Sequence, residues 1–487
     1  MNVTLLENIL GRLLMAFSVT IAIPLMVALF YRETAMWSFL ISLLITALVG
    51  AIMFFHGKID GKIGVRDSFA VVGGAWIFAS LFGALPFIIS GVVPTYIDAL
   101  FETVSGLTTT GASVLTDLEL LPRSILLWRS LLHWIGGMGI IVMFIVLLPN
   151  LGIGNARIFY SETPGPIDDK IVPRIKDTAT ILWRIYFGLT VINVLLLLAA
   201  GMSLFDAINH AFATMATGGF STRTASIEAY NSIPIELITA GFMLIAGSNF
   251  SLFIQVWKQR SLKPLRDAEL KCYLLIVSIS IVIIAASLVI QQGVSSGPAL
   301  RDSVFQTASI MTTTGFASTD FDQWPGIAKM VLFFLMFIGA SAGSTAGGIK
   351  VSRILLLVKM GLAQLKQAIH PRLVVNIVVQ DRVVDSSVLT NVGRFFFVYF
   401  LTFALGSLLV AGTGLEPFDA MSASIATLSS IGPGFGVVGP MYTYASLHPF
   451  AKGVLTVLML LGRLELFTLL VFLQPDFWRV KRTNKMK

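Results

Sequence analysis

Four stretches of the chain repeat one pattern, and this pattern strongly limits the folds that the chain can adopt. They read DALFETVSGLTTTGAS from Asp98, DAINHAFATMATGGFS from Asp206, DSVFQTASIMTTTGFA from Asp302 and DAMSASIATLSSIGPG from Asp419. In each copy a hydroxyl residue stands eleven positions after the aspartate, and a glycine stands thirteen positions after it. A spacing kept in four copies indicates one structural unit used four times.

The segments between these stretches are apolar enough to cross a membrane. Of the 487 residues, 56% are hydrophobic and 12% are charged, and this charged fraction is about half that of a typical soluble domain. Apolar runs of about 20 residues are the mark of membrane-spanning helices. We expect ten spans, at about 8–31, 36–56, 68–91, 123–149, 178–201, 233–257, 271–292, 326–360, 387–412 and 449–473.

Each repeated stretch falls between two spans and is too short to cross the bilayer. From aspartate to glycine it can form about 12 helical residues, or roughly 18 Å of helix. A half-helix that ends in non-helical backbone at membrane depth must line a cavity or be buried in protein. The sequence therefore predicts an all-α polytopic membrane protein. Four pseudo-symmetric units of helix, half-helix, filter loop and helix surround a central pore, and an N-terminal helix pair precedes them.

The unit boundaries and the orientation follow from the same pattern. We expect the helix pair in 1–60 and the pore units in 61–156, 157–260, 261–370 and 371–487. Most of the 34 lysines and arginines lie at one end of the spans, which the positive-inside rule makes cytoplasmic, together with both termini. The net charge of +8 is then a topology signal and not a nucleic-acid surface. The stretch 361–386 is either a cytoplasmic interface with a partner or a linker.

The four loops carry the residue types that a cation pore needs. Rings of backbone carbonyls replace the hydration shell of a cation, and glycine tolerates the dihedral angles that aim carbonyls at an axis. Oxygen ligands without a carboxylate suit a weakly hydrated monovalent cation better than calcium or magnesium. The predicted ion-binding residues are Thr109, Thr110, Gly111, Thr217, Gly218, Gly219, Thr313, Thr314, Gly315, Ser430, Ile431 and Gly432, with Gly434 as an alternative to Gly432.

The four aspartates lie too far from the glycines to bind the same ion. At the start of a half-helix, an aspartate can cap the first N–H groups and complement the positive end of the helix dipole. We therefore expect structural caps at Asp98, Asp206, Asp302 and Asp419.

Two features of the later spans predict a gate below the filter. The eighth span contains SAGSTAGG, and small residues in mid-span either let a helix break or pack closely against another helix. We expect an intramembrane loop containing Gly343, Ser344, Thr345, Gly347, Gly348 and Lys350. Arg463 lies near the middle of the last span, where a charge must face protein or water. It either restrains cation flow or forms an ion pair, for example with Glu102 or Asp206.

Other kinds of chemistry find little support. The single cysteine, Cys272, excludes an intrachain disulfide. The glycine-rich eighth span has Ile349 where a phosphate-binding loop needs lysine. His210 has no matching histidines for a metal site, and Arg129 and His133 are expected to be structural. We therefore predict no enzyme and no organic cofactor in this chain.

The four loops resemble those of the Trk/Ktr/HKT potassium transporter superfamily. So do HWIGGMGIIV at 133–142, LPNLGIGNARIFYSETPGP at 148–166, GASAGSTAGGIKVSRILLL at 339–357 and LLGRLELFTLLVFL at 460–473. The likeness covers essentially the whole chain, and the leading helix pair favours the bacterial Trk type over the shorter Ktr type. The resemblance implies potassium as the transported ion, the gate loop and the restraining role of Arg463. It also implies a homodimer in the bacterial inner membrane, regulated by a ring-forming cytoplasmic nucleotide-binding subunit of the TrkA type.

Two alternatives remain open at this point. A secondary transporter for another small solute would use broken helices at the midplane, with two-fold repeats, whereas the sequence shows four. The sequence also leaves open passive conduction against coupling to protons or sodium, as in a sodium-coupled cation symporter.

Overall fold

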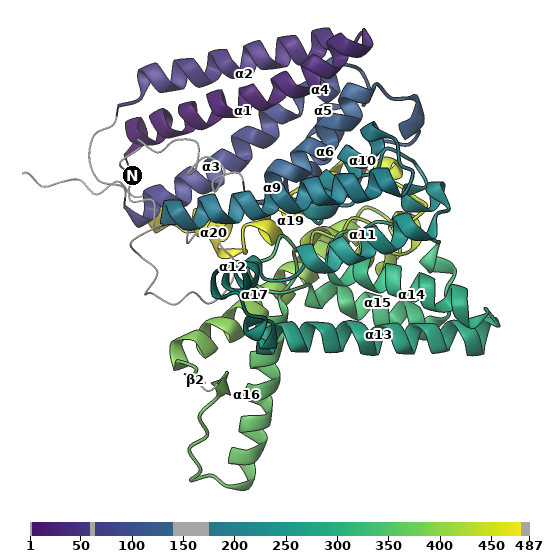
Figure 1. The fold of residues 1–487 in the computed structure, drawn as a ribbon. Helices are drawn as coiled ribbons and strands as arrows, with labels where there is room; N and C mark the ends of the chain where they lie inside the picture. Colours follow the sequence, from purple (N-terminus) through teal and green to yellow (C-terminus); the bar gives the residue numbers. More distant parts are fainter. Residues whose placement is uncertain (1, 59–63, 140–174, 381, 479–487) are drawn as a thin grey trace, which may run out of the picture.

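The computed structural model describes residues 2–58, 64–139, 175–380 and 382–478. The regular secondary structure of this part of the chain is helical (Figure 1), apart from one two-residue antiparallel strand pair, β1 (Val378–Val379) with β2 (Arg382–Val383). Six of its helices are long and apolar enough to cross a membrane, or up to eight if each bent helix pair is one span. The predicted fold class is therefore confirmed, whereas the count of ten spans is not. The end of the predicted fourth span lies outside the described residues.

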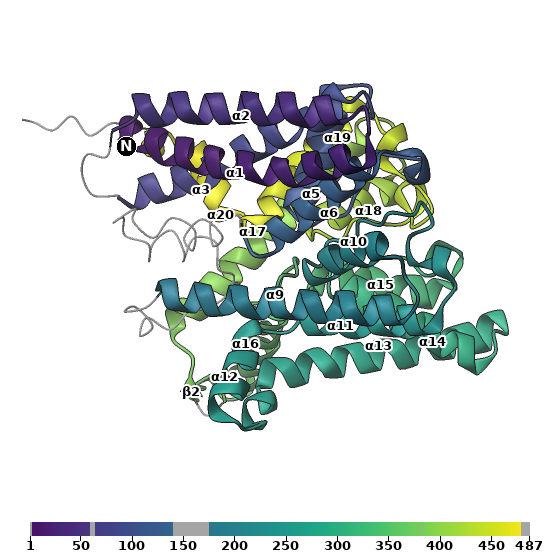
Figure 2. The same cartoon turned by 45° about the horizontal axis from the view of Figure 1, so that its top comes forward.

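The N-terminal pair consists of α1 (Val3–Tyr31) and α2 (Met36–His56), which run side by side along one edge of the molecule in both ribbon views (Figures 1 and 2). Small residues let the two backbones approach closely, as is common between membrane helices. A Cβ added to Gly11 would lie 2.7 Å from the carbonyl oxygen of Gly50.

Four units follow, and in each a short helix of 12–16 residues covers the start of the repeated stretch: α5 (Tyr96–Leu107), α10 (Leu204–Met215), α14 (Ser296–Met311) and α18 (Pro417–Leu428). The first unit has α3 (Val65–Gly83), α4 (Leu85–Ile89), α5 and α6 (Arg123–Gly137), and the second has α9 (Ile175–Ala199), α10, α11 (Ile233–Ala246) and α12 (Phe250–Gln259). The third has α13 (Ala268–Gln292), α14, α15 (Gly326–Ile338) and α16 (Val351–Ile369). The fourth has α17 (Ser386–Ala411), α18, α19 (Pro449–Arg463), α20 (Phe467–Leu470) and α21 (Pro475–Trp478). Short 3₁₀ turns lie between the helices at Leu118–Leu120, Ser226–Tyr230, Lys263–Arg266, Phe321–Gln323, Gly436–Val438, Tyr444–Ser446 and Val471–Leu473.

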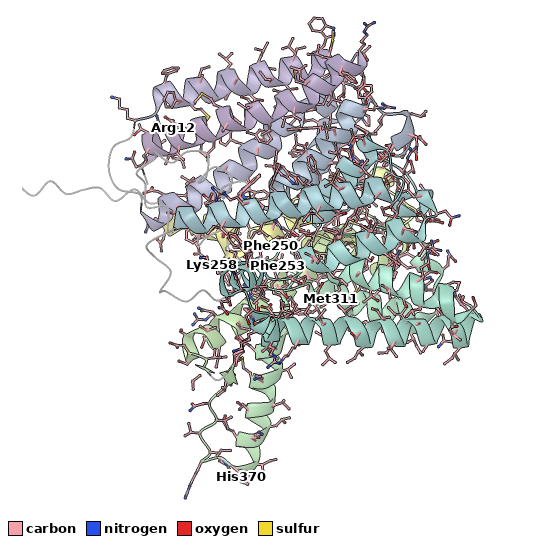
Figure 3. The ribbon with its side chains drawn as sticks, in the orientation of Figure 1. Arg12, Phe250, Phe253, Lys258, Met311 and His370 are labelled. Atoms are coloured by element: carbon pink, nitrogen blue, oxygen red, sulfur yellow. The ribbon has the colours of Figure 1, made fainter. Side chains whose placement is uncertain are left out.

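The units close into a ring. The helix after each short helix packs both on that short helix and on the short helix of the next unit: α6 contacts α5 and α10, and α11 contacts α10 and α14. In the same way α15 contacts α14 and α18, and α19 contacts α18 and α5. The last unit therefore meets the first. The short helices, which we call the pore helices, converge on the middle of the molecule, where Met311 at the end of α14 is fully buried (Figure 3).

In the part of the chain that the structure describes, three crossings are broken, and the sequence analysis singled out one of them. The expected break separates α15 from α16, and α16 then leaves the body of the molecule with His370 at its far end (Figures 1 and 3). In addition, α11 and α12 are bent by 86°, and α19 meets the helical segment at 467–473 at 111°. Asn249 starts a new helix by accepting a hydrogen bond from the amide of Ser251, and Glu465 and Leu466 both adopt positive φ.

Candidate functional site

The four pore helices end in the same way. Each stops nine residues after its aspartate, at Leu107, Met215, Met311 and Leu428. Two positions later the backbone is left-handed, with φ of 56° at Thr109, 54° at Thr217, 55° at Thr313 and 57° at Ser430. The amide of the following residue bonds the carbonyl five positions back, at 2.8–2.9 Å in every copy. Glycine is the usual residue at this turn, so a hydroxyl side chain held there at a cost of about 1–2 kcal/mol indicates a use for the hydroxyl.

The repeated glycines interlock the four loops. A Cβ on Gly111 would lie 2.2 Å from the carbonyl oxygen of Gly218, and one on Gly219 would lie 2.0 Å from that of Thr314. A Cβ on Gly315 would lie 1.8 Å from the carbonyl oxygen of Ile431, and one on Gly432 would lie 2.6 Å from that of Thr110. The glycine of each loop thus lies against the carbonyl of the residue that precedes the glycine in the next loop. The fourth loop meets the first in the same way, so the four loops close into a ring. We call these loops the filter ring.

This register distinguishes the two candidates in the fourth loop. Gly432 has φ of 97°, like the 78–83° of the other three ring glycines. Gly434 has no left-handed φ, and its amide bonds the carbonyl of Val438 at 2.7 Å. Gly432 is therefore the structural equivalent of Gly111, Gly219 and Gly315.

The ring hydroxyls fall into two pairs. Thr109 Oγ1 and Ser430 Oγ are buried and have no hydrogen-bond partner among the described residues. Thr217 Oγ1 bonds the carbonyl of Ala216 at 2.6 Å, and Thr313 Oγ1 accepts from the amide of Gly347 at 2.7 Å. A buried hydroxyl without a partner is unfavourable and calls for an explanation. Oxygens of this kind can coordinate a cation.

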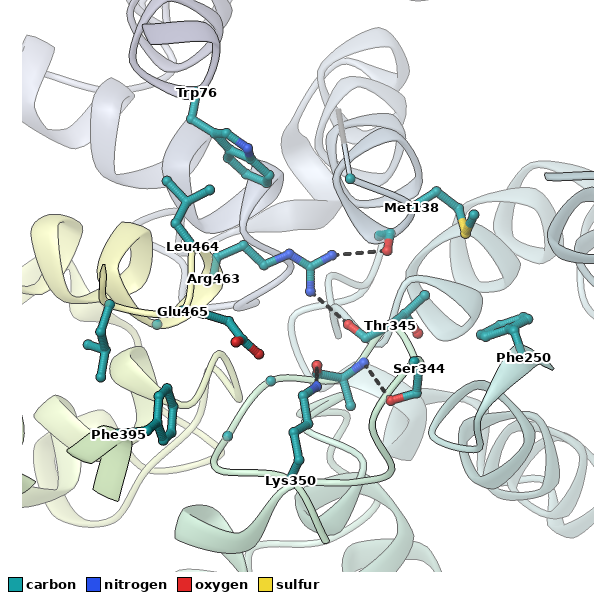
Figure 4. Close-up of a pocket in the computed structure, with 18 of the residues that line it drawn as sticks. Trp76, Met138, Phe250, Ser344, Thr345, Lys350, Phe395, Arg463, Leu464 and Glu465 are labelled. Carbon is teal, nitrogen blue, oxygen red and sulfur yellow. Dashed lines mark hydrogen bonds between the residues drawn. The ribbon is translucent and has the colours of Figure 1, made fainter. Parts of the chain in front are cut away.

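One face of the ring opens into a cavity. This first cavity, of about 90 Å³, is lined by the four ring glycines together with residues such as Ser113, Ser221 and Tyr444. A second cavity, of about 130 Å³, is lined by the segment between α15 and α16, by the end of α6 and by Arg463 (Figure 4). The segment between α15 and α16, residues 339–350, separates this second cavity from the ring. We call this segment the gate loop.

The gate loop contacts the ring directly, and it contains all the predicted gate residues of the eighth span. A Cβ on Gly347 would lie 2.1 Å from the carbonyl oxygen of Ser429. Thr345 Oγ1 donates to the carbonyl of Met215 at 3.1 Å, at the end of the second pore helix. The loop also docks on the break between α11 and α12, because Phe250 donates its amide to the carbonyl of Gly343 at 3.1 Å. The loop therefore lies between the ring and the second cavity.

A carboxylate that the sequence analysis did not single out binds the gate loop near its start and the helix α16 just after its end. Glu269 Oε1, in the first turn of α13, accepts from the amides of Ala342 at 2.6 Å and Ser352 at 3.1 Å. The sequence shows Glu269 as an acidic residue at the start of an apolar span, which marks it as a candidate for a specific contact. Its bonds to residues more than 70 positions later were not predictable from spacing.

Arg463 reaches into the second cavity and bonds carbonyl oxygens (Figure 4). Its Nη1 donates to Thr345 of the gate loop at 2.7 Å, and its Nη2 donates to Gly136 and Gly137 at 2.6 and 3.0 Å. The two glycines form the last turn of α6, where the helix dipole favours a positive charge. The carboxylates proposed from the sequence as its partners bond other cations, Glu102 with Arg129 and Asp206 with Arg223. Lys350 donates to the carbonyl of Ala346 within the gate loop.

The aspartates are not the N-caps that the sequence predicted. The caps are Thr95, Ser203, Ser295 and Glu416. Asp98, Asp206 and Asp419 are each the third helical residue, and Asp302 is the seventh because α14 starts earlier. The hydroxyls of Thr95 and Ser203 donate to Asp98 and Asp206 at 2.6 and 3.0 Å, an arrangement like a capping box. Three of the aspartates thus still complement the helix dipole from the first turn.

Comparison with known proteins now decides the family. The sequence model of a family described as "TrkH: Cation transport protein" matches residues 36–479. The chain belongs to this TrkH family. It is therefore a multi-pass membrane transporter and not an enzyme.

Relatives match along their whole length. The Trk system potassium uptake protein TrkH of Halomonas elongata is 41% identical over 485 residues, which are 98% of this chain and 100% of that protein. The protein of the same name from Escherichia coli strain K12 is 42% identical over 484 residues, again 98% and 100% of the two chains. The crystal structure of the potassium transporter TrkH from Vibrio parahaemolyticus superposes with a TM-score of 0.89 at 39% identity, covering 98% of this chain and 100% of that one.

Proposed function

We propose that this protein carries potassium ions into a bacterial cell, across the inner membrane, through the filter ring. The observation that carries this proposal is the interlock of the four loops. Each loop sets one carbonyl oxygen, that of Thr110, Gly218, Thr314 or Ile431, against the glycine of its neighbour. A closed set of four carbonyls can replace the hydration shell of a cation. The names of the relatives as potassium uptake proteins support potassium as that cation.

The electrostatics of the ring fit a monovalent ion. The twelve predicted filter residues, all described, include no carboxylate, whereas calcium and magnesium sites use acidic oxygens. The C-terminal ends of all four pore helices face the ring, and their partial negative charge favours a cation. The unpartnered hydroxyls of Thr109 and Ser430 add two neutral oxygens.

Below the ring, the gate loop closes the path and Arg463 restrains cation flow. The loop contacts the ring through Gly347 and Thr345 and is held by Glu269 and Arg463. Opening therefore requires these contacts to break together. A cytoplasmic nucleotide-binding ring of the TrkA type would supply the force, acting on a homodimer with both termini in the cytoplasm. The family resemblance supports these partners. For the four pore units we propose the boundaries that the sequence predicts, at 61, 157, 261 and 371.

Flux into liposomes tests this proposal. The purified chain is reconstituted, and uptake of rubidium and of sodium is measured with and without a pH gradient. Rubidium uptake that exceeds sodium uptake and is indifferent to the gradient supports selective passive conduction. Equal uptake of the two ions contradicts a selective filter. Rubidium uptake that requires a sodium or proton gradient replaces passive conduction with a coupled symporter.

A further inference from the structure

The first two filter loops share a buried ion pair. Arg129 on α6 donates from Nε to Glu102 Oε1 on α5 at 2.7 Å, and the side chains are 2% and 0% exposed. The other guanidinium nitrogens donate to Ser113 Oγ at 3.1 Å and to the carbonyl of Ser221 at 3.0 Å. The guanidinium also lies 4.0 Å from the ring centre of Phe220.

These contacts lie directly behind the ring glycines. Ser113 follows Gly111 by two residues, and Ser221 follows Gly219 by two. Glu102 in turn accepts from Ser113 Oγ at 3.0 Å and from the amide of Val114 at 2.9 Å. One ion pair thus connects the segment that follows the ring glycine in the first loop to the segment that follows it in the second.

The corresponding position differs in the other repeats. Four residues after the aspartate stand Glu102, His210, Gln306 and Ala423. His210 Nε2 bonds Ser221 Oγ at 2.9 Å, and Gln306 Nε2 lies 3.4 Å from Ser318 Oγ. In three of the four repeats, the side chain at this position of the pore helix therefore bonds a serine that follows the ring glycine of the same loop. In the first pore helix this residue is the charged Glu102, and Arg129, which pairs with it, also bonds the second loop at Ser221.

A second side chain of α6 acts at the same junction. His133, one turn after Arg129, bonds the carbonyl of Gly106 through Nδ1 at 2.8 Å and accepts from the amide of Phe220 through Nε2 at 3.2 Å. Its ring occupies the space where a side chain at Gly218 would lie, because a Cβ there would be 2.5 Å from His133 Cγ. The junction is therefore built for a glycine at 218, where loops one and three carry threonine.

We propose that the Glu102–Arg129 pair is a positioning device for ion selectivity, which fixes the distance between the first and second filter loops. The inference rests on the proposed function of the ring as a potassium filter. Neither side chain touches the ion; the pair acts through the backbone of 111–114 and 219–221. A carbonyl ring selects between ions of different size or hydration only as far as its oxygens are held in place. A charged, hydrogen-bonded pair holds them more firmly than neutral contacts do.

The test must remove both charges of the pair, so that no single buried charge is left without its partner. Loss of one partner of a buried ion pair is strongly destabilising, whereas replacement of both is much better tolerated. The variant is therefore the double substitution Glu102→Gln/Arg129→Gln. Its matched control is Glu236→Gln/Arg301→Gln, which removes an ion pair of 2.6 Å between α11 and α14, away from the ring.

The measurement is the ratio of rubidium to sodium uptake by the full chain in liposomes, normalised to folded protein. We expect the ratio to fall by roughly five- to tenfold in the Glu102/Arg129 variant and to stay at the wild-type value in the control. Arg129→Lys keeps the charge but loses the planar fork, so we expect an intermediate ratio. It also provides a readout if the double variant does not fold.

A parallel variant in the ring separates this inference from the function on which it rests. If Gly219→Ala changes the ratio and the Glu102/Arg129 and Arg129→Lys variants do not, the positioning role is overturned while the filter stands. If none of them changes the ratio, the filter proposal fails and the inference fails with it. An equal fall of the ratio in the control and in the Glu102/Arg129 variant also overturns the positioning role, because it shows a general effect of lost stability.

Discussion

The filter ring and the region directly below it are built on opposite principles. In the ring, four loops repeat one backbone geometry, with φ at the hydroxyl residue within 54–57° in every copy. Below it, the three crossings that the structure describes in full differ: α11 and α19 bend by 86° and 111°, and α15 gives way to the gate loop. Carbonyls and hydroxyls line the ring, whereas Lys350, Arg463 and Glu465 line the cavity below.

The contrast suits two separate tasks: selection of the ion in the ring, and control of the flux below it. Four equal oxygen donors around an axis suit a spherical ion, and they require repetition. A gate needs one element that moves against fixed neighbours, and it requires that the copies differ. Changes in the ring should therefore alter which ion passes, and changes below it should alter how much passes.

A side chain in the ring should cause the largest loss. Gly315→Ala puts a Cβ 1.8 Å from the carbonyl oxygen of Ile431, at a φ of 83°. We expect rubidium uptake to fall by about 100-fold, since displacements near 1 Å at a positioned site have effects of this order. Gly241→Ala in α11 is the control, because its Cβ would meet nothing within 4 Å. Wild-type uptake and selectivity in Gly315→Ala would remove the ring from the pathway.

Removal of the charge below the ring should raise flux without changing selectivity. Arg463→Ala removes a positive charge beside the path and frees the carbonyl of Thr345. We expect rubidium uptake to rise by about tenfold, with the rubidium-to-sodium ratio unchanged. Arg463→Lys keeps the charge, and we expect it to stay near the wild-type rate. Reduced uptake by folded Arg463→Ala protein would favour a purely structural role.

Release of the gate loop from Glu269 should have a similar but smaller effect. Both bonds to Glu269 end on the same oxygen, Oε1, so Glu269→Gln can retain them and Glu269→Ala cannot. Hydrogen bonds to a charged group are worth about 1.5–3 kcal/mol. We expect leak flux to rise by about fivefold in Glu269→Ala and by less in Glu269→Gln. Equal effects of the two variants would show that the charge matters and the bonds do not.

Substitution of the ring hydroxyl residues should have effects that depend on what each hydroxyl contacts. Thr109→Val removes an unpartnered hydroxyl, and we expect the concentration for half-maximal rubidium uptake to rise about threefold. Thr313→Val removes the acceptor for the amide of Gly347, and we expect increased leak instead. Both changes conserve shape, so they form a matched pair. Identical uptake curves for the two variants would contradict the division between ion selection and control of the flux.

The repeats made the pore helices, the ring glycines and the gate loop predictable, because each depends on local backbone preferences. Glycine at a fixed distance from a helix end and small residues in an apolar span are visible in one sequence. The true N-caps were visible as well: Thr95 and Ser203 each stand three residues before an acid, as in a capping box.

Contacts between distant residues were not predictable. The bend after Arg463 falls within the sequence LLGRLELF, which contains no proline. It lies beside the bonds of Arg463 to α6 and of Glu465 to Arg353 at 2.7 Å. The order of the four loops around the ring and the pairing of Arg129 with Glu102 also depend on how whole helices pack, which spacing along the chain does not reveal.

Anomalous scattering from rubidium can show whether an ion binds in the filter ring. The full chain is crystallised in rubidium, and the anomalous density is located in the resulting structure. We expect a peak on the axis of the filter ring, within coordination distance of the carbonyl oxygens of Thr110, Gly218, Thr314 and Ile431. A protein that transports rubidium in liposomes but shows no density at the ring would contradict the account.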